Sequence, residues 1–73
     1  MRNQQRYCEA GMSAADRRQI QEALRRLDYY QGSMDGIFGP QTRAAIRRFQ
    51  RDIGAQTTGS LTAEQANLLV RTP

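Results

Sequence analysis

The sequence predicts a small all-α protein, a three-helix bundle with a long packed loop between the first and second helices. Three segments repeat apolar residues at helical spacing, and polar stretches containing glycine separate them. A chain of 73 residues has room for these helices and one modest core. Because such a core leaves little space for an enclosed catalytic pocket, we do not expect an enzyme.

The charged residues favour an anionic partner. The chain has 11 basic residues, all of them arginine, against 7 acidic ones, and its formal net charge is +4. It contains no histidine, the commonest general base and metal ligand. Cys8 is the one cysteine, so an internal disulfide is excluded. We therefore expect no metal, no cofactor and no catalytic residue.

The N-terminal segment differs from the rest of the chain. Residues 1–12 show no apolar period, so we expect a flexible arm or the remnant of a linker, followed by a domain over residues 13–71. No apolar run is long enough to span a membrane, and the N-terminus lacks an apolar signal core. The protein is therefore either cytoplasmic or a piece of a longer exported chain.

The first helix is predicted over residues 14–28. Ser13 is suited to cap it, with Asp16 close to the positive end of the helix dipole. Polar residues such as Gln21 fall mostly outside its apolar stripe. That stripe follows the i, i+3, i+4, i+7 spacing and consists of Ile20, Ala23, Leu24 and Leu27.

The second helix is predicted over residues 40–53. Gly39 at the cap and Pro40 at the first helical position form a favourable start, and Gly54 is suited to end the helix in a left-handed conformation. Its opposite side carries Arg43, Arg47, Arg48 and Arg51, and the first, second and fourth of these, spaced four residues apart, form a basic ridge. Its inward stripe consists of Thr42, Ala45, Ile46, Phe49 and Ile53.

The third helix is short, about residues 63–70. Thr62 and Gln65 match a capping box, and Leu61 is placed to pack on Ala66 as a hydrophobic staple. The residues expected to face inward are Ala66, Leu69 and either Val70 or Leu68.

The loop between the first two helices has about eleven residues, which is longer than usual. Asp35-Gly36 is a strong turn dipeptide within it. Tyr29 and Tyr30 are adjacent and cannot share one face, so we expect Tyr30 to close the core and Tyr29 to show a face to solvent. The loop should be packed down by its own apolar residues, Met34, Ile37 and Phe38.

Two stretches that precede helices share a pattern of glycine, serine, an apolar residue and a capping residue. They are residues 32–35 and 59–62. The pattern is either a coincidence or the trace of an internal duplication.

An ordered set of residues runs through these segments. Asp35-Gly36-x-Phe38-Gly39-x-x-Thr42 is followed by Ala45-Ile46-x-x-Phe49-Gln50 and then by Thr58-Gly59-x-Leu61. With this pattern, residues 17–70 resemble the peptidoglycan-binding domain of type 1. That family is a three-helix module attached to cell-wall amidases, lytic enzymes, L,D-transpeptidases and other exported bacterial proteins. One departure is Gln65, where the family often has threonine.

The resemblance implies non-catalytic binding of peptidoglycan, through glycan strand and stem peptide, in the periplasm or at the cell surface. The domain would be a monomer that targets an attached protein to the wall, without zinc. Most of the loop is expected to serve packing and capping, through Gly32, Gly36, Phe38, Gly39 and Thr42. Tyrosine faces suit sugar rings and arginine forks suit carboxylates, so the expected ligand-binding residues are Tyr29, Tyr30, Asp35, Gln41, Arg43 and Arg47.

Two other functions fit parts of the sequence. The arginine-rich second helix and the positive charge are compatible with a nucleic-acid-binding three-helix domain. However, the long loop before that helix is unlike the short turn of a helix-turn-helix motif, so no nucleic acid is expected. A module that contacts another part of a larger enzyme is the third possibility.

Overall fold

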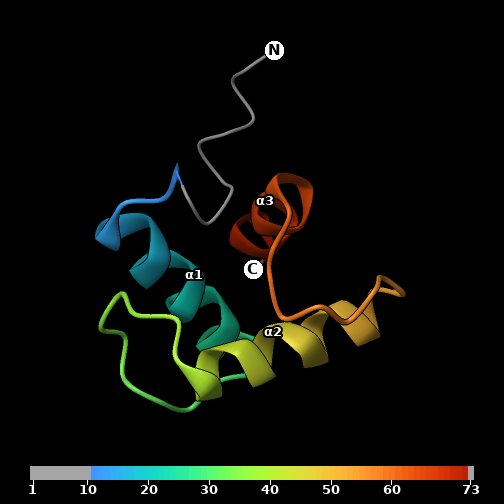
Figure 1. The fold of residues 1–73 in the computed structure, drawn as a ribbon, viewed down its shortest axis with the longest axis horizontal. Helices are drawn as coiled ribbons and strands as arrows, with labels where there is room; N and C mark the ends of the chain where they lie inside the picture. The colour runs from blue at the N-terminus through green and yellow to red at the C-terminus, as the bar shows by residue number, and fades with distance from the viewer. Residues whose placement is uncertain (1–10, 73) are drawn as a thin grey trace.

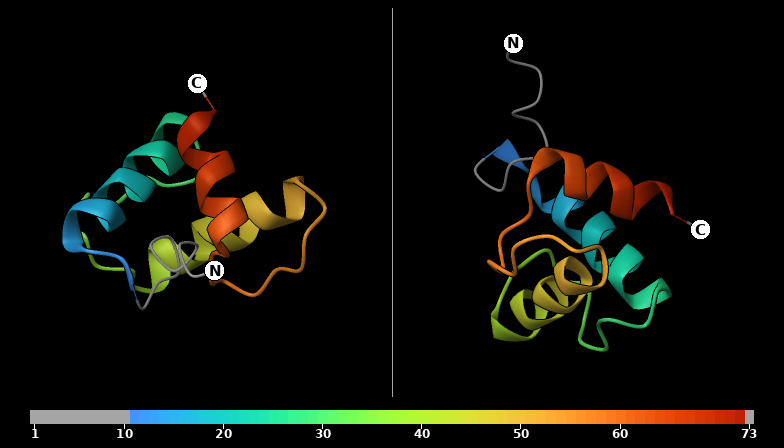
Figure 2. Two further views of the ribbon diagram at one scale, coloured as in Figure 1. Left: turned by 90° about the horizontal axis from the view of Figure 1, so that it is seen from above. Right: turned by 90° about the vertical axis from the view of Figure 1, so that its right-hand side faces the viewer.

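The computed structural model describes residues 11–72 and confirms the predicted three-helix fold (Figure 1). Helix α1 spans Ala14–Arg26, α2 spans Pro40–Asp52 and α3 spans Ala63–Arg71. Helix α1 packs against both of the others, and the right-hand view of Figure 2 shows it between them. No helix within the described part of the chain is long and apolar enough to cross a membrane.

The predictions for the N-terminal arm, residues 1–12, fall mostly outside the described residues, and Cys8 is among those not described. Met12 is described and is 6% exposed. Its side chain belongs to the same buried cluster as the helices, so packing of the domain extends to this residue.

The hydrophobic core is built from the predicted stripes of all three helices. Tyr30 joins it at 5% exposure, whereas Tyr29 is half-buried, as expected from their adjacency. Val70, rather than Leu68, packs on the core from α3. The other buried apolar residues are Ile20, Ala23, Leu24, Ala45, Ile46, Phe49, Leu61, Ala66 and Leu69.

The helices begin where their capping residues predict. The Ser13 hydroxyl accepts a hydrogen bond from the Asp16 backbone N–H at 3.1 Å, and the Asp16 carboxylate accepts one from the Ser13 N–H at 3.3 Å. Thr62 and Gln65 form the same reciprocal pair at α3. At α2, Gly39 is the cap and the proline follows it, so that no N–H is lost from the helix.

Helix α1 ends at Arg26, two residues earlier than the sequence predicted. Asp28 has a positive φ of 72°, and the Tyr29 N–H turns back to the carbonyl of Leu24 at 2.8 Å. This is a Schellman ending, in which a left-handed residue lets the last carbonyls be satisfied. The sequence did not point to it because aspartate takes this conformation less readily than glycine.

Helix α2 ends in the same way, with Gly54 at the predicted left-handed position and a φ of 76°. The helix stops at Asp52, one residue early. The prediction that Ile53 faces inward is wrong, since this side chain is 40% exposed. Ile53 is the cap residue, and the chain turns away from the core at that point.

Two of the three apolar residues expected to pack down the α1–α2 loop do not do so. Ile37 is 66% exposed and Met34 is 36% exposed, so this prediction is wrong for both. Phe38, expected in the core, is only half-buried and packs on its edge. The loop therefore needs another source of order.

That source is Gln21, a side chain with no exposed surface. The prediction that Gln21 falls outside the inward-facing stripe of α1 is wrong, because the side chain is buried. Its Oε1 accepts from the Gly36 N–H at 2.9 Å. Its Nε2 donates to three oxygens, the Ile37 carbonyl at 2.9 Å, Thr42 Oγ1 at 3.2 Å and Asp35 Oδ1 at 3.3 Å. Hydrogen bonds to a buried amide thus replace apolar packing in this loop.

Arg17 completes the attachment of the same loop to α1. Its Nε donates to the Gly36 carbonyl at 2.7 Å, and its Nη1 donates to the Met12 carbonyl at 2.9 Å. Gly36 itself has a φ of 81°, a left-handed conformation that favours glycine. Both backbone groups of this one glycine are therefore bound by side chains of α1.

The α2–α3 loop is attached to α2 by Gln50, which is also fully buried. Its Oε1 accepts from the Gly59 N–H at 3.0 Å, and Arg43 Nη1 donates to the Gly59 carbonyl at 3.0 Å. The Gln50 Nε2 donates to the Ser60 carbonyl, Thr58 Oγ1 and Gln65 Oε1.

The two loops correspond in geometry, but not in the alignment that the Gly-Ser pattern suggested. That pattern pairs Gly32 with Gly59. In the structure Gly36 is the counterpart of Gly59, because these two are the left-handed glycines bound by a buried glutamine. The two Gly-Ser pairs in the sequence therefore occupy positions with different structural roles.

Candidate ligand-binding groove

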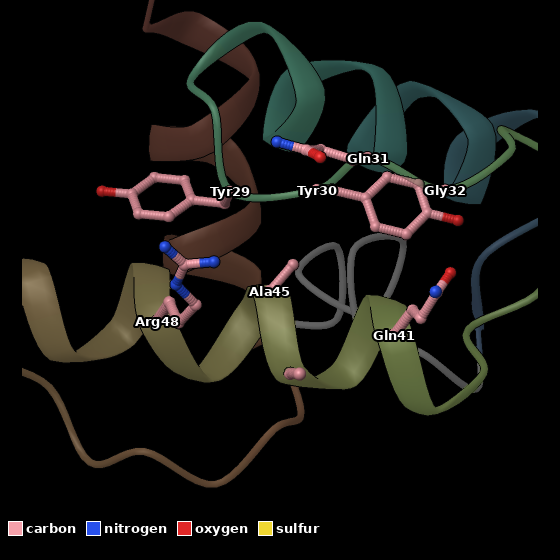
Figure 3. Close-up of a pocket in the computed structure, with 8 residues that line it drawn as sticks. Tyr29, Tyr30, Gln31, Gly32, Gln41, Ala45 and Arg48 are labelled. Carbon is pink, nitrogen blue, oxygen red and sulfur yellow. The ribbon is translucent and has the colours of Figure 1, made fainter.

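An open groove of about 490 Å³ lies between the segment that follows α1 and one face of α2. Figure 3 shows Tyr29 and Tyr30 on one side and Gln41, Ala45 and Arg48 on the other. The α2 residues lie on one face, because their spacing of three or four residues matches the helical repeat. The complete lining consists of Tyr29, Tyr30, Gln31, Gly32, Gln41, Ala44, Ala45 and Arg48.

Tyr29 is held in place by two contacts at one end of the groove. Its ring meets the ring of Phe49 in a T-shaped contact, with centroids 5.9 Å apart. Its hydroxyl donates a hydrogen bond of 2.5 Å to the Asp52 carboxylate. That hydrogen bond, followed by desolvation, raises the pKa of the Tyr29 phenol. The hydrogen bond to Asp52 therefore favours the neutral phenol and orients its hydroxyl group.

Tyr30 and Gly32 shape the wall of the groove. The Tyr30 ring is buried, and its hydroxyl donates to the Ser33 carbonyl at 2.5 Å. A Cβ atom on Gly32 would lie 2.6 Å from Gln41 Oε1 and 2.7 Å from the Tyr30 hydroxyl oxygen. Glycine is needed at position 32 because Gln41 and Tyr30 lie so close to it, and not because of its backbone conformation. Any side chain would collide with these two groove residues.

Asp35 lies beside the groove rather than in it. It lines a smaller hollow of about 270 Å³ that shares Tyr30 and Gln41 with the groove. Its Oδ1 also accepts from the Ile37 N–H at 3.0 Å. This backbone hydrogen bond, and then the one from Gln21, lower the pKa of the Asp35 carboxyl. The Asp35 carboxylate therefore accepts hydrogen bonds that stabilise the turn, although it is exposed to solvent.

The two arginines expected to bind ligand lie elsewhere. Arg43 is half-buried, donates to the Gly59 carbonyl and stacks over the Phe38 ring at 5.8 Å. Arg47 also lies beside Gly59, where an added Cβ would be 3.0 Å from its Nη1. Neither lines the groove that contains the tyrosines.

The groove thus brings together three of the six residues that the sequence singled out, Tyr29, Tyr30 and Gln41. The arginine that does line it, Arg48, was not singled out. The sequence did hold a signal for Arg48. It follows Gln41 by seven residues, so the two side chains lie two helical turns apart on the same face of α2.

The chemistry of the groove is that of recognition. It offers aromatic surface, amide donors and acceptors, and one guanidinium. Among residues 11–72, no group of three or more His, Cys, Asp or Glu side chains is placed to hold a metal ion. These features define a small all-α module with an open polar groove on its surface.

The chain belongs to the family described as "Putative peptidoglycan binding domain", which it matches over residues 13–69. It is 49% identical to localization factor PodJL of Caulobacter vibrioides over 49 residues, 67% of this chain and 5% of PodJL. It is 33% identical to a spore cortex-lytic enzyme of Bacillus cereus over 63 residues, 86% of this chain and 24% of that enzyme.

These relatives are much longer than this chain, which spans 24% or less of their length. No solved structure gives a significant match. Peptidoglycan binding is supported at the level of the family.

Proposed function

We propose that this domain binds peptidoglycan without catalysing a reaction, and that it targets an attached protein to the bacterial wall. The observation that carries the proposal is the open groove of Tyr29, Gln41 and Arg48 in a member of this family. Its work would take place in the periplasm or at the cell surface, where the polymer is accessible. The relative named a localization factor is in keeping with a targeting role.

The groove residues match the parts of peptidoglycan. The Tyr29 ring supplies aromatic surface for the C–H face of a sugar, and its hydroxyl is already bound to Asp52. The Gln41 side chain is exposed and has both a donor and an acceptor for hydroxyl or acetamido groups. An open groove admits a long polymer from the side, which an enclosed pocket does not.

The test is co-sedimentation of the purified domain with insoluble sacculi at moderate salt. We expect the wild-type domain in the pellet. Ala44→Trp, which adds a large side chain to the lining of the groove, should leave most of the protein in the supernatant. Ala15→Trp is the matched control, because Ala15 is exposed on α1 and does not line the groove.

The outcome also separates the groove from simple charge attraction. If the Ala44→Trp variant stayed in the pellet, the binding surface would have to lie outside the groove. Release of the wild-type domain by a DNA oligonucleotide, with a steep dependence on salt, would favour nucleic-acid binding instead.

A further inference from the structure

Arg48 has a position that no other described arginine shares. It stands on the exposed face of α2 and lines the groove. Figure 3 shows its side chain rising toward Tyr29, at the end of the groove away from Gln41. The groove is therefore polarised, with a cationic end and a neutral amide end.

The other arginines near the loops already have structural tasks. Arg17, Arg26 and Arg43 each donate to a backbone carbonyl. No such bond and no ion pair involves Arg48 among residues 11–72. One candidate partner on the same helix, Asp52, lies one turn further along α2, and its carboxylate accepts from the Tyr29 hydroxyl. The Arg48 guanidinium is thus available to a ligand.

The planar guanidinium of Arg48 also lies where a ligand in the groove can reach it. Arginine binds a carboxylate through two parallel N–H groups, so it reads both the charge and the shape of its partner. The groove itself is lined by no carboxylate side chain. A ligand carboxylate entering it meets one cation and no lining anion, although Asp52 stands close by.

We propose that Arg48 makes the groove selective for a ligand with a free carboxylate. Applied to the proposed function, on which this inference rests, the domain binds stem peptides with free carboxylates in preference to amidated ones. The sugar occupies the tyrosine and Gln41 part of the groove, and the peptide carboxylate reaches Arg48. Amidation removes the charge and one acceptor oxygen, and places N–H donors against the N–H donors of the guanidinium.

The test uses two soluble muropeptides that share the same disaccharide and peptide and differ only in amidation of the stem carboxylates. Binding to the 15N-labelled domain is followed by chemical shifts at low salt. We expect the wild-type domain to bind the free-acid form about fivefold more tightly, as suits one exposed charged contact. Arg48→Gln should bind both forms equally, and Arg48→Lys should keep part of the preference.

Arg47→Gln is the matched control, since it removes an adjacent arginine that lies outside the groove. It should keep the full preference. The ratio of the two affinities is the readout, because a general loss of packing would weaken both forms alike. Equal binding of both forms by the wild-type domain, or loss of the preference in Arg47→Gln, overturns the role of Arg48 and leaves the proposed function standing. If neither form binds the wild-type domain, both proposals fail.

Discussion

Gln21 and Gln50 hold the two interhelical loops by the same arrangement of hydrogen bonds. Each is fully buried, and each Oε1 accepts from the N–H of a left-handed glycine, Gly36 or Gly59. Each Nε2 donates to the carbonyl of the residue that follows its glycine. The fold thus uses one device twice, with α1 holding the loop before α2 and α2 holding the loop before α3.

Replacing either glutamine by leucine should destabilise the domain strongly. The change keeps the volume, but it leaves a buried glycine N–H and a loop carbonyl without partners, and each unsatisfied group costs about 1–3 kcal/mol. We expect Gln21→Leu and Gln50→Leu each to lower the free energy of unfolding by about 2 kcal/mol, measured by urea denaturation. Gln19→Leu, at an exposed position of α1, should change it by less than about 0.5 kcal/mol. A similar small change at Gln21 would mean that the loop does not depend on this amide.

Serine should have opposite effects at two glycines of the α1–α2 loop. Gly36 has a φ of 81°, and an added Cβ would lie 3.0 Å from the Ala14 carbonyl oxygen. Gly36→Ser should therefore cost about 1–3 kcal/mol. Gly39 has an ordinary φ of −84°, caps α2 and has open space around it. Gly39→Ser should gain a few tenths of a kcal/mol from a side-chain cap. Equal melting temperatures for the two variants would contradict this assignment.

Asp28 occupies a position that favours glycine. Its φ of 72° at the end of α1 costs roughly 1 kcal/mol for a residue with a side chain. Asp28→Gly should raise the midpoint of urea denaturation, whereas Asp28→Ala should lower it or leave it unchanged. If the alanine variant were the more stable of the two, the left-handed ending of α1 would be wrong.

Stability should fall in acid through Asp35. The hydrogen bonds from Ile37 and Gln21 hold the pKa of its carboxyl below the ordinary value of 3.8. A lowered pKa in the folded state means that the contribution is present above that value and is lost as the pH falls through the folded pKa. Asp35→Asn, which keeps an acceptor oxygen, should therefore lose less stability than the wild type between pH 6 and about pH 3. Glu22→Gln controls for the loss of one negative charge, and an equal loss in Asp35→Asn and wild type would remove Asp35 as the cause.

The candidate groove could be predicted only in part. Tyr29 and Tyr30 drew attention because they are adjacent aromatics beside a turn, and the structure places both in the lining. The arginines were harder to assign, because Arg43, Arg47 and Arg48 look alike in the sequence. Which one faces the groove depends on how α2 is rotated against α1, a property of the packed core rather than of local spacing.

The sequence by itself determined the three helices, their caps and the apolar stripes, because these depend on neighbours within a few residues along the chain. Its loop motif also led to the family. Only the tertiary structure decided that the loops are held by Gln21 and Gln50 rather than by Met34 and Ile37. A glutamine beside an apolar stripe can lie in solvent or be buried, and burial becomes favourable only when a distant loop supplies partners for its amide. Those partners come from residues 8 to 21 positions away in the chain, beyond the reach of local patterns.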